Sequence, residues 1–163
     1  MTNERHNASA QLHAPVPLAE CALARAIRTI GDGWTLLILR EALCGVERFD
    51  AMRDDLGIPR SVLSQRLKQL TSEGLLQRKP YSLPGQRPRD GYVLTERGRA
   101  LIPALAALRE WAETHLPGGP SRLRLQDSDG QKVLTHLIRE DGEPVEDIAA
   151  IVAVAVPPDT NPA

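Results

Sequence analysis

With 163 residues, the chain can form one ordinary domain with an appendage, and its longest apolar run, Ile148 to Val156, is too short to cross a membrane. The formal net charge of −1 hides a basic middle, with 11 Lys and Arg against 6 Asp and Glu over residues 48–99, and an acidic end, with 4 against 8 over residues 117–163. Two cysteines without paired spacing and no signal peptide exclude a disulfide framework, so we expect a soluble cytoplasmic protein whose basic middle meets a polyanion.

The first half of the chain reads as a disordered lead followed by helices. Residues 1–18 are polar, contain two prolines and show no apolar period. Helical spacing of apolar residues, with glycines at the ends, then predicts helices over about 19–31, 33–45, 48–57 and 60–73. The last of these follows a tight break, and Pro59 stands where Ser or Thr usually caps a helix.

The second half begins with a hairpin. Two short strands, 75–81 and 90–95, flank a loop rich in Pro, Gly and Arg. Thr95 is expected to cap a last helix, "ERGRALIPALAALREWAETHL", with Pro103 as an irregularity near its first turns. The fold class is therefore mainly α with a small β-hairpin wing (α+β), a winged helix-turn-helix formed by residues 19–117.

Residues 118–163 form an acidic C-terminal extension beyond that domain. Its two Asp-Gly pairs, at 129–130 and 141–142, predict hairpin turns between short strands, and the apolar run near 148–156 predicts a final strand. The extension is expected to avoid DNA because of its acidic balance.

Helix 60–73 presents two different faces. Its leucines at 63, 67 and 70 turn inward, which leaves a polar face without an acidic residue. The outward residues are Arg60, Ser61, Ser64, Gln65 and Lys68. An α-helix fits the major groove of B-DNA, so the first four are candidate base readers and Lys68 a candidate phosphate contact. Arg66 lies off this face and is expected to serve packing or a salt bridge.

The hairpin adds a second candidate DNA contact, the wing over residues 82–91. Arg87 and Arg89 flank Pro88 in a thin loop suited to a minor groove, and Arg78 and Lys79 could hold phosphates. An isolated polar helix face or hairpin tip is more often merely solvated. The order of helix, tight break, helix and basic hairpin favours DNA binding over that simpler interpretation.

Several motifs follow one another in order over roughly residues 19–116: the early Cys21, "GDGWTLLILREAL", "ERFDAMRDDLGI", "SVLSQRLKQLTSEGLLQR", "YVLTERG" and "LREW". Together they resemble a known family, the HxlR-type winged helix-turn-helix transcriptional regulators of bacteria. The resemblance implies a homodimer through the first and last helices, with two recognition helices about 34 Å apart on a pseudo-palindromic operator. Apolar Leu105, Leu108, Trp111 and Leu116 suit such an interface.

Cys21 occupies the position at which some members of this family sense electrophiles or oxidants. A helix N-terminus and the nearby Arg25 favour a thiolate, whereas Glu20 opposes it and Ala22 replaces the proline that is usual in the family. Two interpretations stay open: a thiol sensor of an electrophile or other small-molecule effector, and a structural cysteine packed at the interface. Cys44 is expected to have only a packing role, at the end of a helix.

The sequence leaves three classes of function to compare. The first is a sequence-specific DNA-binding regulator with double-stranded DNA and a second copy as partners. The alternative is a winged-helix protein interaction module without specific DNA binding, which would need an apolar or acidic outward face on helix 60–73. An enzyme is not expected, because the sequence has no phosphate loop, nucleophile elbow or Cys/His cluster, and neither a cofactor nor a metal is implied.

Overall fold

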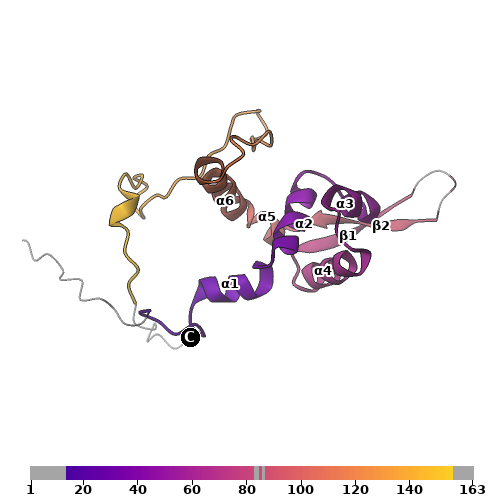
Figure 1. Ribbon diagram of the computed structural model, residues 1–163, viewed down its shortest axis with the longest axis horizontal. Helices are drawn as coiled ribbons and strands as arrows, with labels where there is room; N and C mark the ends of the chain where they lie inside the picture. Colours follow the sequence, from indigo (N-terminus) through magenta and orange to yellow (C-terminus); the bar gives the residue numbers. More distant parts are fainter. Residues whose placement is uncertain (1–13, 83–84, 86, 156–163) are drawn as a thin grey trace, which may run out of the picture.

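The computed structural model describes residues 14–82, 85 and 87–155, so residues 1–13 of the lead predicted over 1–18, and Val156 of the predicted final strand, lie outside the described residues. The elements in chain order are α1 (Ala22–Ile30), α2 (Gly33–Leu43), α3 (Phe49–Leu56), α4 (Arg60–Ser72), β1 (Leu76–Tyr81), β2 (Arg89–Leu94), α5 (Glu96–Arg99), α6 (Ile102–His115) and the 3₁₀ turn η1 (Ile148–Ala150). In Figure 1, α2, α3, α4 and the hairpin form one body, from which α1, α6 and the extension project. The predicted mainly helical fold with one hairpin is confirmed.

The four N-terminal helices begin and end close to their predicted limits. Asp32 starts α2, where its carboxylate accepts a hydrogen bond from the Thr35 N–H at 3.2 Å. Gly57 ends α3 with a left-handed φ of 60°, a conformation that glycine adopts without the strain of a side chain. These short connections keep α2, α3 and α4 in contact.

The core lies between α2, α4 and the start of the hairpin. Its buried members are Ile38, Leu39, Met52, Ile58, Leu63, Leu67, Leu70, Leu75, Leu76 and Leu94. One carboxylate, that of Glu41, is buried beside them and accepts a hydrogen bond from Arg40 at the surface, which raises the pKa of Arg40. The inward face predicted for α4 is therefore confirmed.

The single last helix predicted after Thr95 is wrong, because the structure divides it into α5 and α6. The Thr95 hydroxyl caps α5 as expected, accepting from the Gly98 N–H at 3.0 Å. The chain then turns at residues 100–101, and α6 restarts with Pro103 in its first turn. Proline has no N–H to donate to a preceding carbonyl, so the helix breaks there instead of bending.

The C-terminal extension turns at both predicted Asp-Gly pairs, where Gly130 and Gly142 have φ of 77° and 89°. Each turn closes only one isolated bridge, Gln126 with Lys132 and Ile138 with Pro144, rather than a pair of strands. The predicted final strand is wrong over residues 148–155, where the structure has η1 and then no strand. A strand needs a neighbour for its backbone, and no described segment of the chain lies along this one.

Within the described residues, every helix is too short or too polar to cross a lipid bilayer.

Truncating Leu67 to alanine should lower the free energy of unfolding by about 2–5 kcal/mol, because the side chain is fully buried between α4 and α2. Chemical denaturation followed by circular dichroism measures this loss. Leu37→Ala on the exposed side of α2 is the matched control and should cost less than about 1 kcal/mol. An equal loss in both variants would contradict the placement of the core.

Candidate nucleic-acid interface

A tight turn between α3 and α4 sets the direction of α4. Gly57 reverses the chain, the buried Ile58 anchors the turn in the core, and Pro59 is the N-cap of α4 with φ of −58°. No side chain caps α4, but the Leu63 N–H donates to the Pro59 carbonyl at 3.0 Å, so the helix starts at Arg60 as predicted. The turn and the buried leucines therefore fix which side of α4 faces away from the domain.

Every residue predicted on the outward face of α4 is exposed: Arg60, Ser61, Ser64, Gln65 and Lys68. Arg66 points elsewhere, as expected. Its Nε lies 3.3 Å from the Asp32 carboxylate, and its Nη1 donates to the Gln69 side-chain oxygen at 3.0 Å. The ion pair between Arg66 and Asp32 joins α4 to the N-terminus of α2 and keeps Arg66 off the outward face.

The hairpin is attached to the helices through a backbone contact that the sequence did not predict. Arg48 forms an isolated antiparallel bridge with Gly91, and the Tyr92 N–H donates to the Glu47 carbonyl at 2.8 Å. A side chain at Gly91 would be crowded, since a Cβ there would lie 3.3 Å from that carbonyl oxygen. The segment before α3 thus lies against β2 and holds the hairpin in place relative to α4.

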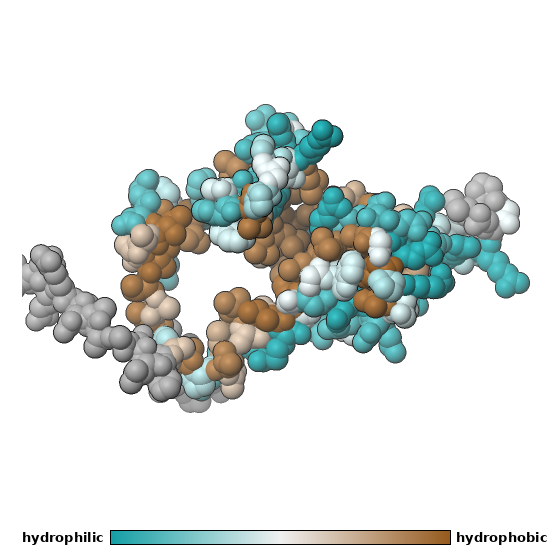
Figure 2. Space-filling view, viewed as in Figure 1, coloured by the Kyte–Doolittle hydropathy of each residue, from teal (hydrophilic) through white to brown (hydrophobic). Residues whose placement is uncertain are grey.

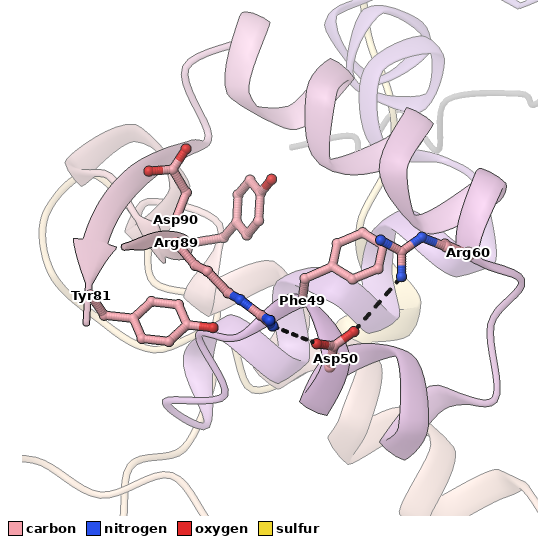
Figure 3. A pocket seen from close by; sticks show the side chains of 7 residues that line it. Phe49, Asp50, Arg60, Tyr81, Arg89 and Asp90 are labelled. Carbon is pink, nitrogen blue, oxygen red and sulfur yellow. Dashed lines mark hydrogen bonds and ion pairs between the residues drawn. The ribbon is translucent and has the colours of Figure 1, made fainter. Parts of the chain in front are cut away.

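Asp50 on α3 joins the start of α4 to the hairpin. Its carboxylate lies 3.9 Å from Arg60 Nη1 and 3.3 Å from Arg89 Nη1, and both contacts are drawn in Figure 3. The Arg60 guanidinium also sits 5.1 Å from the centre of the Phe49 ring. These groups line an open cavity of about 520 Å³, together with Tyr81, Asp90 and Tyr92.

The two arginines at Asp50 come from the two parts that were expected to contact DNA separately. Arg89 does not lie in the loop, as the sequence suggested, but is the first residue of β2, opposite Tyr81. Strand geometry turns its side chain toward α3, and not outward with Arg87. Arg87 is exposed beside the tip of the hairpin, whose residues 83, 84 and 86 lie outside the described part of the chain.

The other predicted basic residues of the hairpin are also paired with carboxylates. Arg78 lies 3.3 Å from Asp90, and Lys79 lies 3.2 Å from Glu47. The two basic side chains are largely exposed and their carboxylate partners partly so, and ion pairs this open to solvent contribute only about 0–1 kcal/mol each. A phosphate can replace these carboxylates at little cost, so the pairs orient the basic side chains without blocking them.

Sequence reasoning missed the acidic partners Asp50 and Glu47, and it did not assign Arg48, whose guanidinium lies 5.3 Å from the centre of the Tyr81 ring. The pairs that join these carboxylates to the hairpin, Lys79 with Glu47 and Arg89 with Asp50, lie 32 and 39 residues apart along the chain, so no local spacing signals them. One sequence signal could have indicated a structured surface here: aromatic residues lie beside charged ones, Phe49 next to Arg48 and Tyr81 close to Lys79.

The domain therefore presents a fixed helix with a polar, acid-free outward face beside a basic hairpin. A family model described as an HxlR-like helix-turn-helix matches residues 29–119, which is more than half of the chain. The chain belongs to the HxlR-like family.

Two similarities extend beyond the part that the family model matches. An uncharacterized HTH-type transcriptional regulator of Mycobacterium tuberculosis is 43% identical to this HxlR-like chain over 122 residues, or 71% of this chain and 76% of the relative. The crystal structure of PA1607, described as a candidate transcription factor, has a TM-score of 0.68 at 34% identity and covers 83% of this chain and 95% of its own. Relatives from Methanothermobacter thermautotrophicus and Synechocystis, 35% and 34% identical, are likewise described as uncharacterized HTH-type transcriptional regulators.

A third similarity concerns a redox regulator. The reduced form of HypR matches this HxlR-like chain with a TM-score of 0.53 at 25% identity, covering 60% of this chain and 95% of HypR. Cys21 is the N-cap of α1, is partly exposed and caps no backbone group through its side chain. Arg25 donates to the Glu20 carbonyl at 3.4 Å. Cys44 is at the end of α2 but is exposed, so the packing role expected for it is wrong. The described residues contain no group of His, Cys, Asp and Glu side chains placed to hold a metal ion.

Replacing Asp50 with Asn should raise the affinity of this HxlR-like chain for unrelated DNA about three- to tenfold at low salt, because a carboxylate that competes with phosphate for Arg60 and Arg89 is removed. Fluorescence anisotropy with a labelled random duplex measures the change. Asp55→Asn, an identical change of charge at an exposed position of α3 outside any described ion pair, should have a smaller effect. Unchanged affinity in the Asp50 variant would show that the carboxylate does not compete with DNA.

Proposed function

We propose that this chain is a sequence-specific transcriptional regulator that binds double-stranded DNA as a homodimer on a pseudo-palindromic operator. α4 enters the major groove, and the wing over residues 82–91 lies at the adjacent minor groove. The observation that carries the proposal is the outward face of α4, which is polar, exposed and free of acidic residues while its opposite face is locked in the core. DNA in bacteria is cytoplasmic, so the protein acts there, and no catalytic step is part of the proposal.

Within this complex the outward residues divide into two roles. Arg60, Ser61, Ser64 and Gln65 lie in the first turns of α4 and read base edges, as donors and acceptors on these side chains match those of the major groove. Lys68, one turn further on, contacts a phosphate, as do Arg78, Lys79, Arg87 and Arg89 of the hairpin. Arg60 and Arg89 exchange the Asp50 carboxylate for DNA when the complex forms.

The homodimer is supported by apolar surface that one copy leaves uncovered. Leu108, Trp111 and Leu116 are exposed on or just after α6, and no side chain of α1 is buried. Apolar side chains of this size rarely gather on a monomer's surface without a partner. A two-fold axis through α1 and α6 covers them and presents two copies of α4 to neighbouring turns of DNA.

The alternative function, a winged-helix module that docks other proteins, is less well supported by the same face. Protein interfaces are centred on aromatic and apolar anchors, and the outward residues of α4 include none.

Substituting Gln65 and Lys68 separately tests the proposal. Gln65→Ala should reduce discrimination against a base change in the operator by about 1–3 kcal/mol, because a base-edge contact is lost. Lys68→Ala should weaken binding to all duplexes and make the salt dependence shallower by about one unit of slope, because one phosphate contact is lost. Titrations at several salt concentrations against the intergenic DNA beside the gene measure both quantities.

The wild-type chain supplies the decisive comparison in the same titrations. If unrelated DNA competes as well as the intergenic fragment, sequence-specific regulation is ruled out. If Gln65→Ala and Lys68→Ala have the same effect on every duplex, the division of roles on α4 is wrong.

We further propose that Cys21 makes DNA binding responsive to electrophiles or oxidants. The support is its place at the N-terminus of α1, its partial exposure and the likeness of the fold to the redox regulator HypR. The competing interpretation is a structural thiol packed at the dimer interface, which would respond to Cys21→Ser by a change in dimer stability and not in reactivity.

Treatment with diamide or a quinone should lower the operator affinity of the wild type at least about tenfold and leave Cys21→Ser unaffected, because only the wild type has the thiol at the start of α1. Anisotropy titrations before and after treatment measure the effect. Cys44→Ser is the matched control and should respond like the wild type. An identical response in wild type and Cys21→Ser excludes the sensor.

A further inference from the structure

Residues 121–135 of the C-terminal extension, here called the cover, are fastened to α6 at both ends. At the first end, the Ser121 N–H donates to the Glu113 carboxylate at 3.2 Å. At the second end, the Thr135 N–H donates to the Glu110 carboxylate at 3.2 Å. Between these contacts the chain turns back on itself through one isolated bridge. No residue of the cover is itself buried, so hydrogen bonds to α6 fix its position.

An apolar cavity of about 220 Å³ lies beneath the cover. Ile102 and Ala106 of α6 line one side of it, and Leu125 and Leu134 of the cover line another, together with Leu43 at the end of α2. A second cavity of about 190 Å³ shares Leu43 and Leu125 with the first, so the apolar space continues along α6. Figure 2 shows hydrophobic atoms gathered between α6 and the body formed by α2, α3 and α4. Side chains from three segments thus surround a space that they do not fill.

The size and the lining of the larger cavity restrict what it can hold. An aliphatic cavity of about 150 Å³ is known to take up benzene, so this one has room for a single ring with small substituents and is too small for a polypeptide segment. The described residues that line it are all uncharged, and an ion would lose its hydration there without a counter-charge. Val133 and Leu134, which are 46% and 52% exposed, leave an apolar way in from solvent.

One polar group in the lining lacks a hydrogen-bond partner. The Thr135 hydroxyl is out of contact with solvent, and its Oγ1 has no partner among the described residues. Leaving a buried hydroxyl unpaired is costly, and such groups in native structures are usually satisfied. A hydroxyl or carbonyl group of a molecule in the cavity can supply the missing partner after the side chain rotates about χ1 to face it.

The cavity is separate from the surfaces used in the proposed function. Leu108, two residues after Ala106, lies about 200° further around α6, so the apolar side chains assigned to the homodimer point away from the cavity. The described lining includes no residue of α1, α4 or the hairpin. Occupation of the cavity therefore competes with neither the second copy nor DNA.

We propose that the cover and α6 enclose a binding site for a small uncharged molecule that carries one ring and one hydroxyl or carbonyl group. The ring occupies the apolar cavity, and the polar group pairs with the Thr135 hydroxyl. The inference goes beyond the proposed function and does not rest on it. It gives a role to the extension, most of which lies beyond the residues that the family model matches.

Two fluorinated probes of equal ring size test the site in the full chain. 4-Fluorophenol carries a hydroxyl where 4-fluorotoluene carries a methyl group. In titrations followed by ¹⁹F NMR, 4-fluorophenol should bind saturably at one site per chain with a dissociation constant of about 1 mM or below. 4-Fluorobenzoate, which has the same ring and a negative charge, should bind at least about tenfold more weakly. Absence of saturable binding, or equal binding of the benzoate, overturns the proposal.

Filling the cavity shows whether the probes bind there. Ala106→Leu places a larger side chain in the apolar space and should raise the dissociation constants of 4-fluorophenol and 4-fluorotoluene at least about tenfold. Ala104→Leu adds the same atoms at an exposed position of α6 outside the described lining, and both constants should stay within about twofold of wild type. Equal constants in the wild type and Ala106→Leu show that the probes bind elsewhere and overturn the proposal.

Removing the hydroxyl tests the polar contact and also serves if Ala106→Leu fails to fold. Thr135→Val keeps the shape of the side chain and the backbone N–H that attaches the cover to Glu110. It should raise the dissociation constant of 4-fluorophenol about three- to tenfold, because a hydrogen bond is lost, and leave that of 4-fluorotoluene within about twofold. An equal effect on both probes, or no effect on either, overturns the proposal.

These measurements need no DNA, so they are independent of the proposed function. A chain that binds 4-fluorophenol as expected but does not distinguish intergenic from unrelated DNA keeps the site and loses the proposed sequence specificity. A chain that binds its operator specifically but gives no saturable binding of the probes keeps the proposed function and loses the site.

Discussion

The burial of three leucines of α4 against α2 is the constraint on which the rest of the domain depends. Leu63, Leu67 and Leu70 lie in the core with Ile38 and Leu39, so α4 cannot rotate about its own axis without exposing them. The opposite face is thereby held toward solvent with its polar residues in a fixed order. A helix that reads DNA needs this rotational constraint more than it needs intrinsic helix propensity, because one wrong rotation replaces every contact residue.

The surface near α4 carries acidic as well as basic side chains. Carboxylates on or just before α3, from Asp50 and Glu47, hold Arg60, Arg89 and Lys79 in place through exposed ion pairs. Such pairs contribute little stability, and they restrict the side chains before DNA arrives. The acidic residues reduce attraction to any polyanion. In the proposed complex with DNA, the remaining affinity would come from contacts that fit a particular sequence, and the carboxylates beside α4 would favour specificity over strength.

The spacing of apolar residues predicted secondary structure correctly where one helix packs one face on the core. It failed where the structure of a segment depends on a second element or on a proline. The helices up to residue 73 follow from apolar spacing and from glycines at their ends, and the hairpin follows from its Pro, Gly and Arg loop. The helix after Thr95 was predicted as one helix with an irregularity at Pro103, since spacing alone does not show whether the proline distorts the helix or divides it. The final strand was predicted from the apolar run near 148–156, but these residues have no neighbouring strand in the described chain.

By itself, the sequence determined the order of the elements, the two faces of α4 and the acid-free outward set, because these depend on spacing of a few residues along one helix. Only the tertiary structure decided that Asp50 joins α4 to the hairpin and that no side chain of α1 is buried in one copy. Contacts between residues far apart along the chain depend on how elements pack, and packing is set by the whole core at once. Local patterns therefore fix which residues are available, and tertiary packing fixes which of them meet.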